Sequence, residues 1–252
     1  MKPKHKGGIT LAKTTFVRKE KKYLLTQEQR DFLLANLPEF MDYDIYCPNG
    51  KTYTVNNIYF DTDTFNVIRN SLSKPAYKAK LRMRTYEGAQ SEDDTVFLEV
   101  KKKIDGVVNK RRIVMSIKEL NSYLKEGIRP STTNPHQNQI FNEIDYILAF
   151  EKVEPKVYLS YKRIAMYDKA NPNLRLTIDE DIITRTNELD LRAERYGKQL
   201  LPENHYLMEI KAEGAYPLWL VHLLSSAKIY PRSFSKYGTF YQNQLKEKLN
   251  HE

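Results

Sequence analysis

The sequence has little from which a disulfide, a thiolate cluster or an imidazole metal centre could be built. Cys47 is the only cysteine among the 252 residues, which excludes an internal disulfide and a site of several cysteine ligands. The five histidines are scattered along the chain, without the spacing of metal ligands. This cysteine usage is compatible with a reducing compartment, and we expect a cytoplasmic protein.

Long apolar runs are also absent. No stretch is long enough to cross a bilayer, and no apolar signal-peptide core follows the basic segment 1–8. We therefore expect no transmembrane segment, a disordered basic tail over residues 1–13 and a single domain over residues 14–252. An apolar content of 40% that includes 18 tyrosines is typical of a folded chain.

What the chain does have is an excess of positive charge. Lysine and arginine total 41 against 32 for aspartate and glutamate, which gives a net charge of +9. Such an excess favours an anionic partner, but it does not choose between a nucleotide, polyphosphate, nucleic acid and an acidic membrane. The basic residues lie at strand-face spacing and the tyrosines form no stacking platform, so we expect no nucleic acid partner.

The charged residues recur at a spacing of two inside segments that otherwise alternate with apolar residues. In a strand, residues i and i+2 lie on the same face, so each segment presents a charged stripe. Any single stripe is ordinary for a strand with one wet face. Together they are rich in Arg, Lys and Glu, and amphipathic helices elsewhere need an apolar sheet face to cover, which favours charged faces that point inward. The stripes are Arg18/Glu20/Lys22, Lys80/Arg82/Arg84, Glu99/Lys101, Lys110/Arg112, Arg175/Thr177/Asp179 and Glu209/Lys211.

The order of elements favours an antiparallel α+β fold in which helices separate groups of strands. The pattern predicts strands over residues 16–25, 52–60, 78–86, 95–103, 107–115, 156–168, 174–184 and 206–212. It predicts helices over residues 27–37, 65–71, 117–126, 139–150, 217–226 and 243–249. A barrel is one way to close such a sheet. The segment 188–201 is too polar to assign.

The stripes carry the groups that phosphate chemistry requires. Arginine donates two parallel hydrogen bonds to a phosphate, and lysine supplies a compact charge. Glu20, Glu99 and Glu209 each stand two residues before a lysine, which pairs an oxygen ligand for Mg²⁺ or Mn²⁺ with a cation for phosphate. The plainer explanation for each such pair is a surface ion pair of little energetic value.

The order of motifs resembles the catalytic domain of the vacuolar transporter chaperone (VTC) family, within the CYTH or triphosphate tunnel metalloenzyme superfamily. The resemblance covers residues 14–240, nearly the whole chain, and rests on several short motifs in the right order. These are FVRKEKKY (16–23), IYFD (58–61), KLRMRTY (80–86), FLEVK (97–101), KRR (110–112), YKR (161–163), RLTID (175–179), LMEIK (207–211) and FSKY (234–237).

The resemblance implies an eight-stranded antiparallel β-barrel tunnel with helices packed on the outside, a divalent Mn²⁺ or Mg²⁺, and a substrate with a triphosphate or longer phosphate chain. By the same resemblance we assign catalytic roles to Lys22, Arg82, Arg84, Lys101 and Lys236. The resemblance also implies substrate-binding roles for Lys110, Arg163 and Arg175 and a metal-holding role for Glu209. We add Arg18 and Ser235, beside the terminal lysine, as substrate-binding residues. By their spacing we add Lys211 as substrate-binding and Glu20 and Glu99 as metal-holding.

One departure from the superfamily pattern directs the functional hypothesis. Many members begin with Glu-x-Glu-x-Lys, whereas this chain has Arg18 at the first acidic position. Fewer carboxylates there favour a longer anionic chain. We therefore expect a metal-dependent polyphosphate polymerase that transfers the γ-phosphate of ATP to a growing chain. A triphosphatase with the same tunnel, or a non-catalytic receptor for polyphosphate or inositol phosphates, remains open. The membrane domains of the eukaryotic complexes are not in this sequence, so coupling to a membrane channel would need a separate membrane protein.

Overall fold

The computed structural model describes residues 18–105 and 107–250, with Arg18 described by its backbone alone. The expected tail over residues 1–13 and the expected domain boundary at residue 14 lie outside this part. The strands are β1 (Arg18–Thr26), β2 (Met41–Tyr43), β3 (Tyr53–Asp61), β4 (Tyr77–Tyr86), β5 (Thr95–Ile104), β6 (Val107–Ser116), β7 (Glu154–Asp168), β8 (Arg175–Arg185), β9 (Lys198–Gln199) and β10 (His205–Glu213). The helices are α1 (Gln27–Asn36), α2 (Asn66–Leu72), α3 (Ile117–Glu126), α4 (Pro135–Glu151), α5 (Leu218–Ser226) and α6 (Lys236–Asn250).

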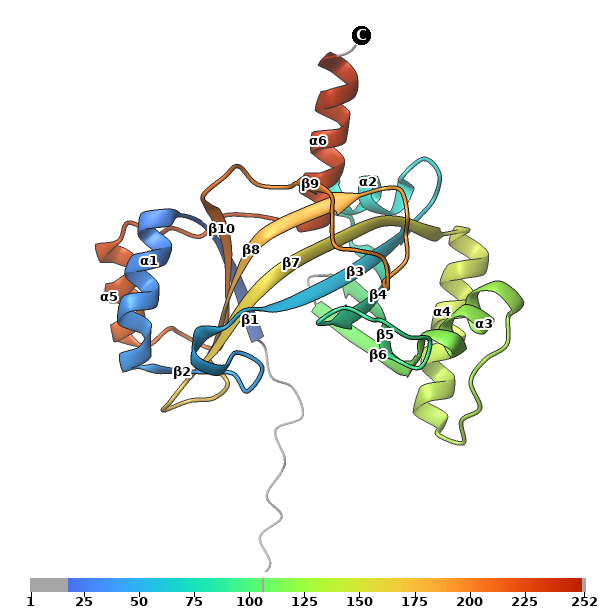
Figure 1. The fold of residues 1–252 in the computed structure, drawn as a ribbon, viewed down its shortest axis with the longest axis horizontal. Coiled ribbons are helices and arrows are strands. Elements are labelled where there is room, and N and C mark those ends of the chain that lie inside the picture. The colour runs from blue at the N-terminus through green and yellow to red at the C-terminus, as the bar shows by residue number, and fades with distance from the viewer. Residues whose placement is uncertain (1–17, 106, 251–252) are drawn as a thin grey trace, which may run out of the picture.

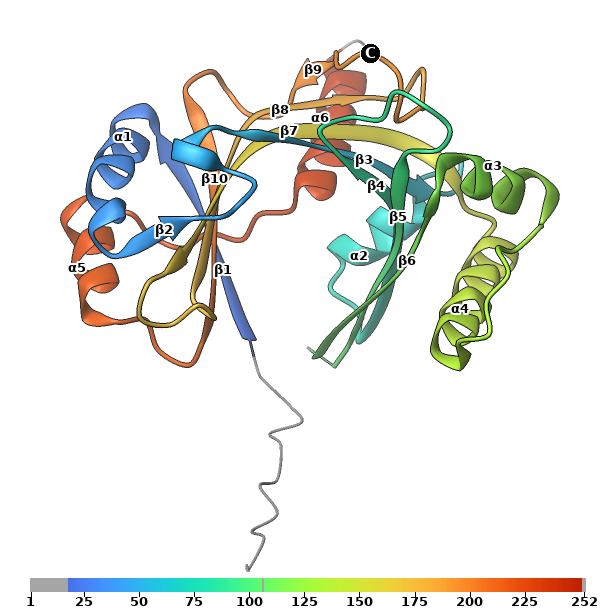
Figure 2. The same cartoon turned by 60° about the horizontal axis from the view of Figure 1, so that its bottom comes forward.

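All the strands join one antiparallel sheet that bends into an arch (Figures 1 and 2). Eight long strands follow the order β1-β10-β8-β7-β3-β4-β5-β6, and the short strands β2 and β9 pair with β7 and β8. The antiparallel α+β class predicted from the sequence is confirmed. The expected closed barrel is not confirmed, because no pairing among the described residues joins β1 to β6 at the two ends of this path.

Local signals explain where the helices on the convex side begin and end. Thr26 and Gln29 form a capping box at the start of α1, and Ser116 and Glu119 form one at the start of α3. Gly127 ends α3 in the left-handed conformation, with φ of 71°. Helix α1 thus starts directly after β1, and helix α3 starts directly after β6, so both helices begin at an end of the sheet.

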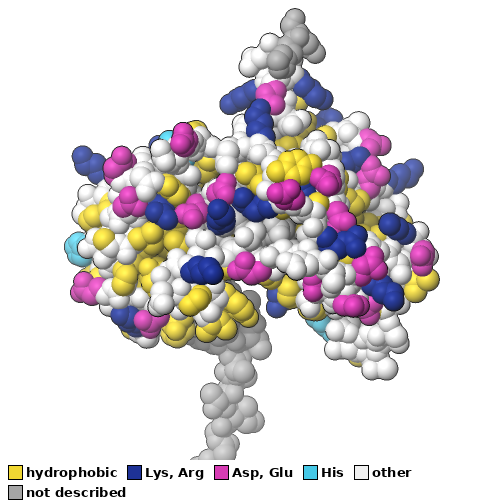
Figure 3. Space-filling view, in the orientation of Figure 1, with side chains coloured by type: hydrophobic (Ala, Val, Ile, Leu, Met, Phe, Trp, Pro, Cys, Tyr) yellow, Lys and Arg dark blue, Asp and Glu magenta, His cyan; other side chains and the backbone are white. Residues whose placement is uncertain are grey.

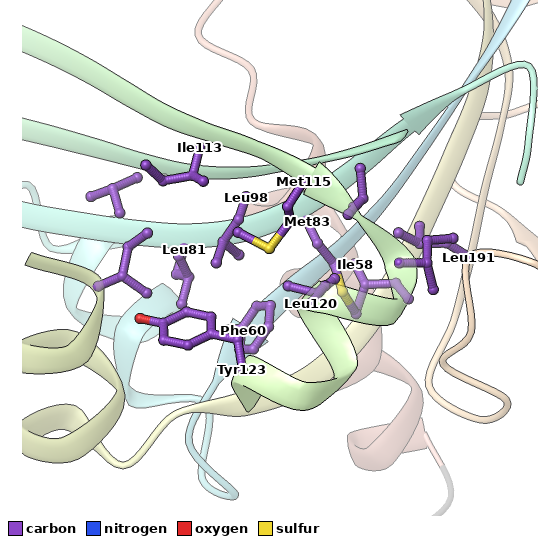
Figure 4. Packing of buried hydrophobic residues seen from close by; sticks show 14 of the residues in the cluster. Ile58, Phe60, Leu81, Met83, Leu98, Ile113, Met115, Leu120, Tyr123 and Leu191 are labelled. Carbon is purple, nitrogen blue, oxygen red and sulfur yellow. The ribbon is translucent and has the colours of Figure 1, made fainter. Parts of the chain in front are cut away.

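Two apolar cores lie on the convex face of the arch. Helices α3 and α4 cover the outer side chains of β3–β6, including Leu81, Met83 and Leu98, and Figure 4 shows this packing around Leu120 and Tyr123. Helix α1 and helix α5 cover the outer side of the other half. These apolar residues alternate with the charged stripes, so the helices turn the charged side chains towards the inside of the arch.

A third core lies on the inner face, which corrects the expectation that all helices pack outside. Leu159 and Leu207 share the inner face with charged residues and pack against Ile68 of α2 and against Tyr237 and Phe240 of α6. Both helices lie beneath the arch in Figure 2. Helices α2 and α6 therefore bury the apolar part of the inner face, and the part that they do not contact is charged.

Buried Asp61 fixes these two inner helices to the sheet. Its carboxylate accepts hydrogen bonds from the backbone N–H groups of Val67 and Ile68 at the start of α2, at 2.9 and 3.0 Å. The hydroxyl of Tyr237 in α6 donates to the same carboxylate at 2.7 Å. The acidic residue of the IYFD motif is thus a structural anchor at a helix N-terminus.

Helix α6 begins seven residues earlier than the sequence pattern predicts, at Lys236 instead of Asn243. The sequence pattern misses this start because Gly238 lies in the first turn of the helix, and glycine is a poor helix former. The position is tightly packed, since a Cβ here would lie 3.0 Å from the side chain of Leu72 and would force that side chain to shift. The described part of the chain contains no helix with the length and apolar character needed to cross a membrane.

Candidate functional site

Strand register gathers most of the predicted residues on the inner face of the arch. Lys22 of β1 lies opposite Glu209 of β10, and Glu20 lies opposite Lys211. In the other half, Arg82 of β4 lies opposite Glu99 of β5. Arg163 of β7 lies opposite Asp179 of β8, and Lys101 lies opposite Lys110. The spacing of two therefore predicts correctly which side chains share the inner face, and a functional role for that face stays a prediction.

The β3–β6 half is organised around buried Glu99. Its carboxylate pairs with Arg82 Nε at 2.8 Å, with Lys110 Nζ and, more distantly, with Arg84 Nε at 3.9 Å. Burial opposes ionisation of Glu99, but these three cations outweigh it and lower its pKa to about 2. Glu99 is therefore a permanent anion that holds cations in place.

Hydrogen bonds orient the two arginines further. Arg84 Nε donates to Oδ1 of buried Asn57 at 2.7 Å, and Arg82 Nη1 donates to the hydroxyl of Tyr59 at 3.1 Å. Burial opposes ionisation of Tyr59, yet Arg82, Arg84 and Lys236 together lower its pKa to about 8. A lowered phenol pKa indicates a strongly positive electrostatic potential around Tyr59.

The other half is organised around buried Asp179. Arg163 donates two hydrogen bonds to this carboxylate, from Nε at 2.6 Å and Nη2 at 2.8 Å, and Lys236 Nζ lies 2.5 Å from it. Burial alone would raise the pKa of Asp179, but Arg163 and Lys236 hold it below its usual value. The bidentate pair fixes the guanidinium plane of Arg163.

Glu209 connects this cluster to β1. Its carboxylate lies 3.3 Å from Lys236 Nζ and 3.6 Å from Lys22 Nζ. Burial would raise the pKa of Glu209, but Lys236, Lys22 and Arg163 lower it well below its usual value. Lys22 also donates to the carbonyl oxygen of Phe234 at 3.2 Å, which ties β1 to the segment that leads into α6.

Tyr161 joins the two halves. Its hydroxyl accepts a hydrogen bond from Arg84 Nη2 at 3.3 Å, and its ring lies beneath Lys236, with Nζ 4.5 Å from the ring centre. Arg163 lies on the same ring at 4.9 Å. Cations from β4, β7 and α6 therefore meet around one buried aromatic side chain.

Lys80 and Lys101 form no ion pair with a carboxylate anywhere in residues 18–105 and 107–250. Partial removal from water lowers the pKa of both lysines, to about 8 for Lys80, although the side chain of Lys101 keeps access to solvent. Lys22 of β1 contributes to both shifts, and Glu20 raises the pKa of Lys101. The two ends of the sheet thus face each other across the arch.

The remaining predicted residues lie towards the edge of the charged face. Arg175 is exposed and lies opposite Lys211, whose Nζ is 3.8 Å from Glu20. Arg18 lies opposite Glu213 in the backbone register, and its side chain is outside the described part. Beside Glu20 and Lys22, a cavity of about 370 Å³ is bounded by the segment 231–234.

Ser235 does not line the sheet. Its hydroxyl accepts a hydrogen bond from the N–H of Gly238 at 3.1 Å and so caps α6. This cap sets the first turn of the helix, which places Lys236 against Asp179 and Glu209. Ser235 thus positions the lysine that follows it, and its predicted contact with substrate stays a prediction.

The three predicted metal-holding glutamates do not converge. Glu20 and Glu209 lie on either side of Lys22, with Glu20 at 3.5 Å from Nζ, whereas Glu99 is enclosed by Arg82 and Lys110. No group of three acidic, histidine or cysteine side chains suited to a metal ion occurs among the described residues. The donor set fits an ion such as Mg²⁺, which takes one or two carboxylates and fills its shell with phosphate oxygens and water.

Sequence reasoning did not single out Asp179, Tyr59, Tyr161 or Lys80 as site residues. Lys80 and Asp179 stand in the same spacing-two stripes as Arg82 and Arg175, so the stripes carried a signal for them. The two tyrosines carried none, because tyrosine is frequent in strands for packing reasons alone.

Figure 3 shows the face of the molecule seen in Figure 1, on which lysine and arginine are interspersed with aspartate and glutamate. This mixture contrasts with the inner face of β4–β6, where Glu99 is surrounded by cations. The positive charge of the inner face is therefore a local feature, distinct from the balanced surface on this side.

Comparisons with known proteins identify the family of this chain and one similar fold. The family model of the VTC domain matches residues 17–243. A candidate adenylate cyclase from Bacillus halodurans has a similar fold, with a TM-score of 0.52 at 16% identity over 86% of this chain and 95% of that one. A candidate adenylyl cyclase from Hippeastrum with a dominant triphosphatase activity aligns at a TM-score of 0.47 and 15% identity, over 89% of this chain and 95% of that one. The VTC match spans nearly all of the chain, and the protein belongs to the VTC domain family.

Proposed function

We propose that this protein is a polyphosphate polymerase that binds the phosphate chain of ATP along the inner face and transfers the γ-phosphate to a growing polyphosphate. The observation that carries the proposal is the preorganised cation cluster. Arg82, Arg84 and Arg163 are held rigidly by buried acceptors, while Lys80 and Lys101 face the interior without carboxylate partners. Such a site is poised for an anion with several phosphates.

The arginines would clamp the nucleotide and Lys22 and Lys236 the reacting phosphate. Because Glu99, Asn57 and Asp179 already fix the guanidinium groups, little ordering is left to occur on binding. A terminal oxygen of the acceptor chain would attack the γ-phosphorus in line. The new P–O bond forms as the bond to the β–γ bridging oxygen breaks, and ADP leaves with that electron pair. No covalent intermediate on the protein is required.

Glu209 and Glu20 are the residues that would hold a divalent ion. When bound, such an ion would neutralise negative charge on the phosphate oxygens. Lys22 Nζ lies 3.5 Å from Glu20 and 3.6 Å from Glu209, so the two carboxylates already attract a cation between them. Mn²⁺ and Mg²⁺ both suit such oxygen ligands.

Membership of the VTC domain family supports phosphate-chain chemistry, and the basic first position of the β1 stripe supports a long chain over a compact triphosphate. The test is incubation of the purified protein with ATP and Mn²⁺ or Mg²⁺, followed by electrophoresis for polyphosphate. A ladder of chains that disappears in Lys101→Ala supports the polymerase. Orthophosphate without a ladder would replace it with a triphosphatase, and phosphate-chain binding without turnover would indicate a receptor.

A further inference from the structure

The inner face of β4–β6 changes character from one end to the other. Five side chains of β4 share this face in the order Lys78, Lys80, Arg82, Arg84 and Tyr86, because they alternate with the outward residues Leu81 and Met83. At the end near the β5–β6 turn, Lys78 lies opposite Lys103. The opposite end is aromatic, since Arg84 lies opposite Phe97 and Tyr86 ends the strand.

The aromatic end is a connected group of rings. The ring of Tyr86 lies 6.2 Å from that of Tyr53 and meets that of Phe97 edge to face at 5.5 Å. Tyr46 extends the group, at 6.2 Å from Tyr53. We call Tyr53, Tyr86 and Phe97, with Tyr46 at the margin, the aromatic platform.

Most of this platform lies outside the hydrophobic cores, and Tyr53 joins it to the third core. Tyr86 remains 39% exposed and Tyr46 68%, and neighbouring Val114 on the same face is 52% exposed. Neither Tyr86 nor Phe97 belongs to any of the three cores formed by the described residues. Large rings that stay open to solvent in the interior of an arch are available to a planar ligand.

Cations border the platform directly. Arg84 lies 5.9 Å from the ring centre of Tyr86, and Arg112 lies 5.0 Å from that of Phe97. Tyr53 stands opposite Arg163, and burial raises its pKa, so its hydroxyl stays neutral beside these charges. A ligand with one planar apolar end and one polyanionic end matches this arrangement.

We propose that the aromatic platform holds the nucleobase of a nucleoside triphosphate, with the phosphates running along β4 from Arg84 towards Lys80. The inference rests on the proposed function, because it takes the cation cluster to be a phosphate site. Tyr86 and Arg82 are four residues apart, which is about 13 Å along a strand and suits the reach from base to terminal phosphate. A phosphate chain with no base would use the lysine end alone, since Lys78 and Lys103 offer it charge without rings.

Recognition by stacking predicts little choice among bases. The platform offers the faces of aromatic rings and the hydroxyl groups of its tyrosines, and every nucleobase has a face that can stack on a ring. The site therefore selects nucleoside triphosphates over inorganic triphosphate by the presence of a base, whatever its identity.

The experiment compares two ligands, ATP and inorganic tripolyphosphate, by titration calorimetry in a chelator so that no turnover occurs. In Tyr86→Leu/Phe97→Leu the Kd for ATP should rise about tenfold, while that for tripolyphosphate changes by less than about twofold. Tyr146→Leu, which removes an exposed ring on α4, is the matched control and should change neither Kd.

A ring-retaining variant covers the case in which the double variant folds poorly. In Tyr86→Trp, ATP should quench the new tryptophan fluorescence and tripolyphosphate should not. Equal weakening of both ligands, or an unchanged ATP affinity with no quenching, overturns the nucleobase site. If the native protein binds neither ligand, the proposed phosphate site itself fails, which is a distinct result.

Discussion

Lys236 Nζ lies 2.5 Å from Oδ2 of Asp179, and both side chains are buried. The same carboxylate accepts two hydrogen bonds from Arg163. The pairing joins the first residue of α6 to the middle of β8, so a contact between distant parts of the chain positions a predicted catalytic lysine. Asp179 is therefore expected to act as a positioning residue for two cations.

Removal of Asp179 should destabilise the empty protein strongly. Asp179→Ala leaves Arg163 and Lys236 buried without their carboxylate, and a broken buried pair of this kind costs about 3–5 kcal/mol in the free energy of unfolding. Urea denaturation measures this loss, and Asp31→Ala on the exposed side of α1 is the control. Tripolyphosphate should raise the urea midpoint of Asp179→Ala more than that of the native protein, because it supplies the missing negative charge. An equal rise in both would contradict this role.

Replacement of Lys101 and of Arg82 by alanine should change the melting temperature of the empty protein differently, although both side chains face the inside of the arch. Arg82 is bound to buried Glu99, so Arg82→Ala should lower the melting temperature of the empty protein. Lys101 has no carboxylate partner in the described part of the chain, so Lys101→Ala should leave that temperature unchanged or raise it slightly. Both variants should reduce the rise that tripolyphosphate causes, as thermal scans at fixed ionic strength would show. A fall in melting temperature for Lys101→Ala would indicate a structural role instead.

Binding of phosphate chains should weaken as the pH rises through 8. Partial burial lowers the pKa of Lys80 and Lys110 to about 8, and for Lys110 this effect exceeds the opposing attraction of Glu99. An incoming polyanion favours the charged lysines, so binding near pH 8 should take up protons, and calorimetry in two buffers of different ionisation enthalpy detects that uptake. In Lys80→Arg the charge persists and the pH dependence should flatten.

The empty protein should show the opposite trend. An unfolded lysine keeps its proton up to about pH 10.4, so between pH 8 and 10 the unfolded state binds more protons than the folded state. Tyr59, whose pKa is lowered to about 8, acts in the same direction. The contribution of these groups to the free energy of unfolding therefore rises with pH over that window, which urea denaturation at pH 7.5 and 9.5 would test.

The sequence predicted the elements and faces of this fold better than their closure. Alternation in segments such as 80–86 predicts both a strand and its charged side, because a period of two requires only local geometry. Whether β1 meets β6 depends on the bend of the whole sheet, which no local pattern encodes. The sequence did not predict the inner position of α2 and α6. Leu159 and Leu207 lie on the same face as charged residues, and this can be recognised only from the strand register.

The site was predictable where its residues share a strand and obscure where they meet through the fold. Lys22, Arg82 and Glu209 follow from spacing, whereas the grouping of Asp179 with Lys236 requires α6 to begin at Lys236, next to β8. Glu99 has a metal-compatible spacing from Lys101, but cross-strand pairing with Arg82 and Lys110 gives it a different environment. Sequence spacing therefore shows which side chains share a face and cannot show which of them neutralise one another.

Glu209→Gln should separate metal dependence from anion binding. Glu209 lies among Lys236, Lys22 and Arg163, so loss of its charge makes the inner face more positive. Tripolyphosphate measured in a chelator should then bind at least as tightly as it does to the native protein. Metal-dependent turnover of ATP should fall by about a hundredfold or more if this carboxylate holds the ion, in line with the loss of one electrostatic group at a reacting centre. Glu180→Gln, at a partly buried pair with Arg30 beside α1, provides the matched control and should keep full turnover. Weaker tripolyphosphate binding in Glu209→Gln would instead show that Glu209 acts by orienting Lys22 and Lys236.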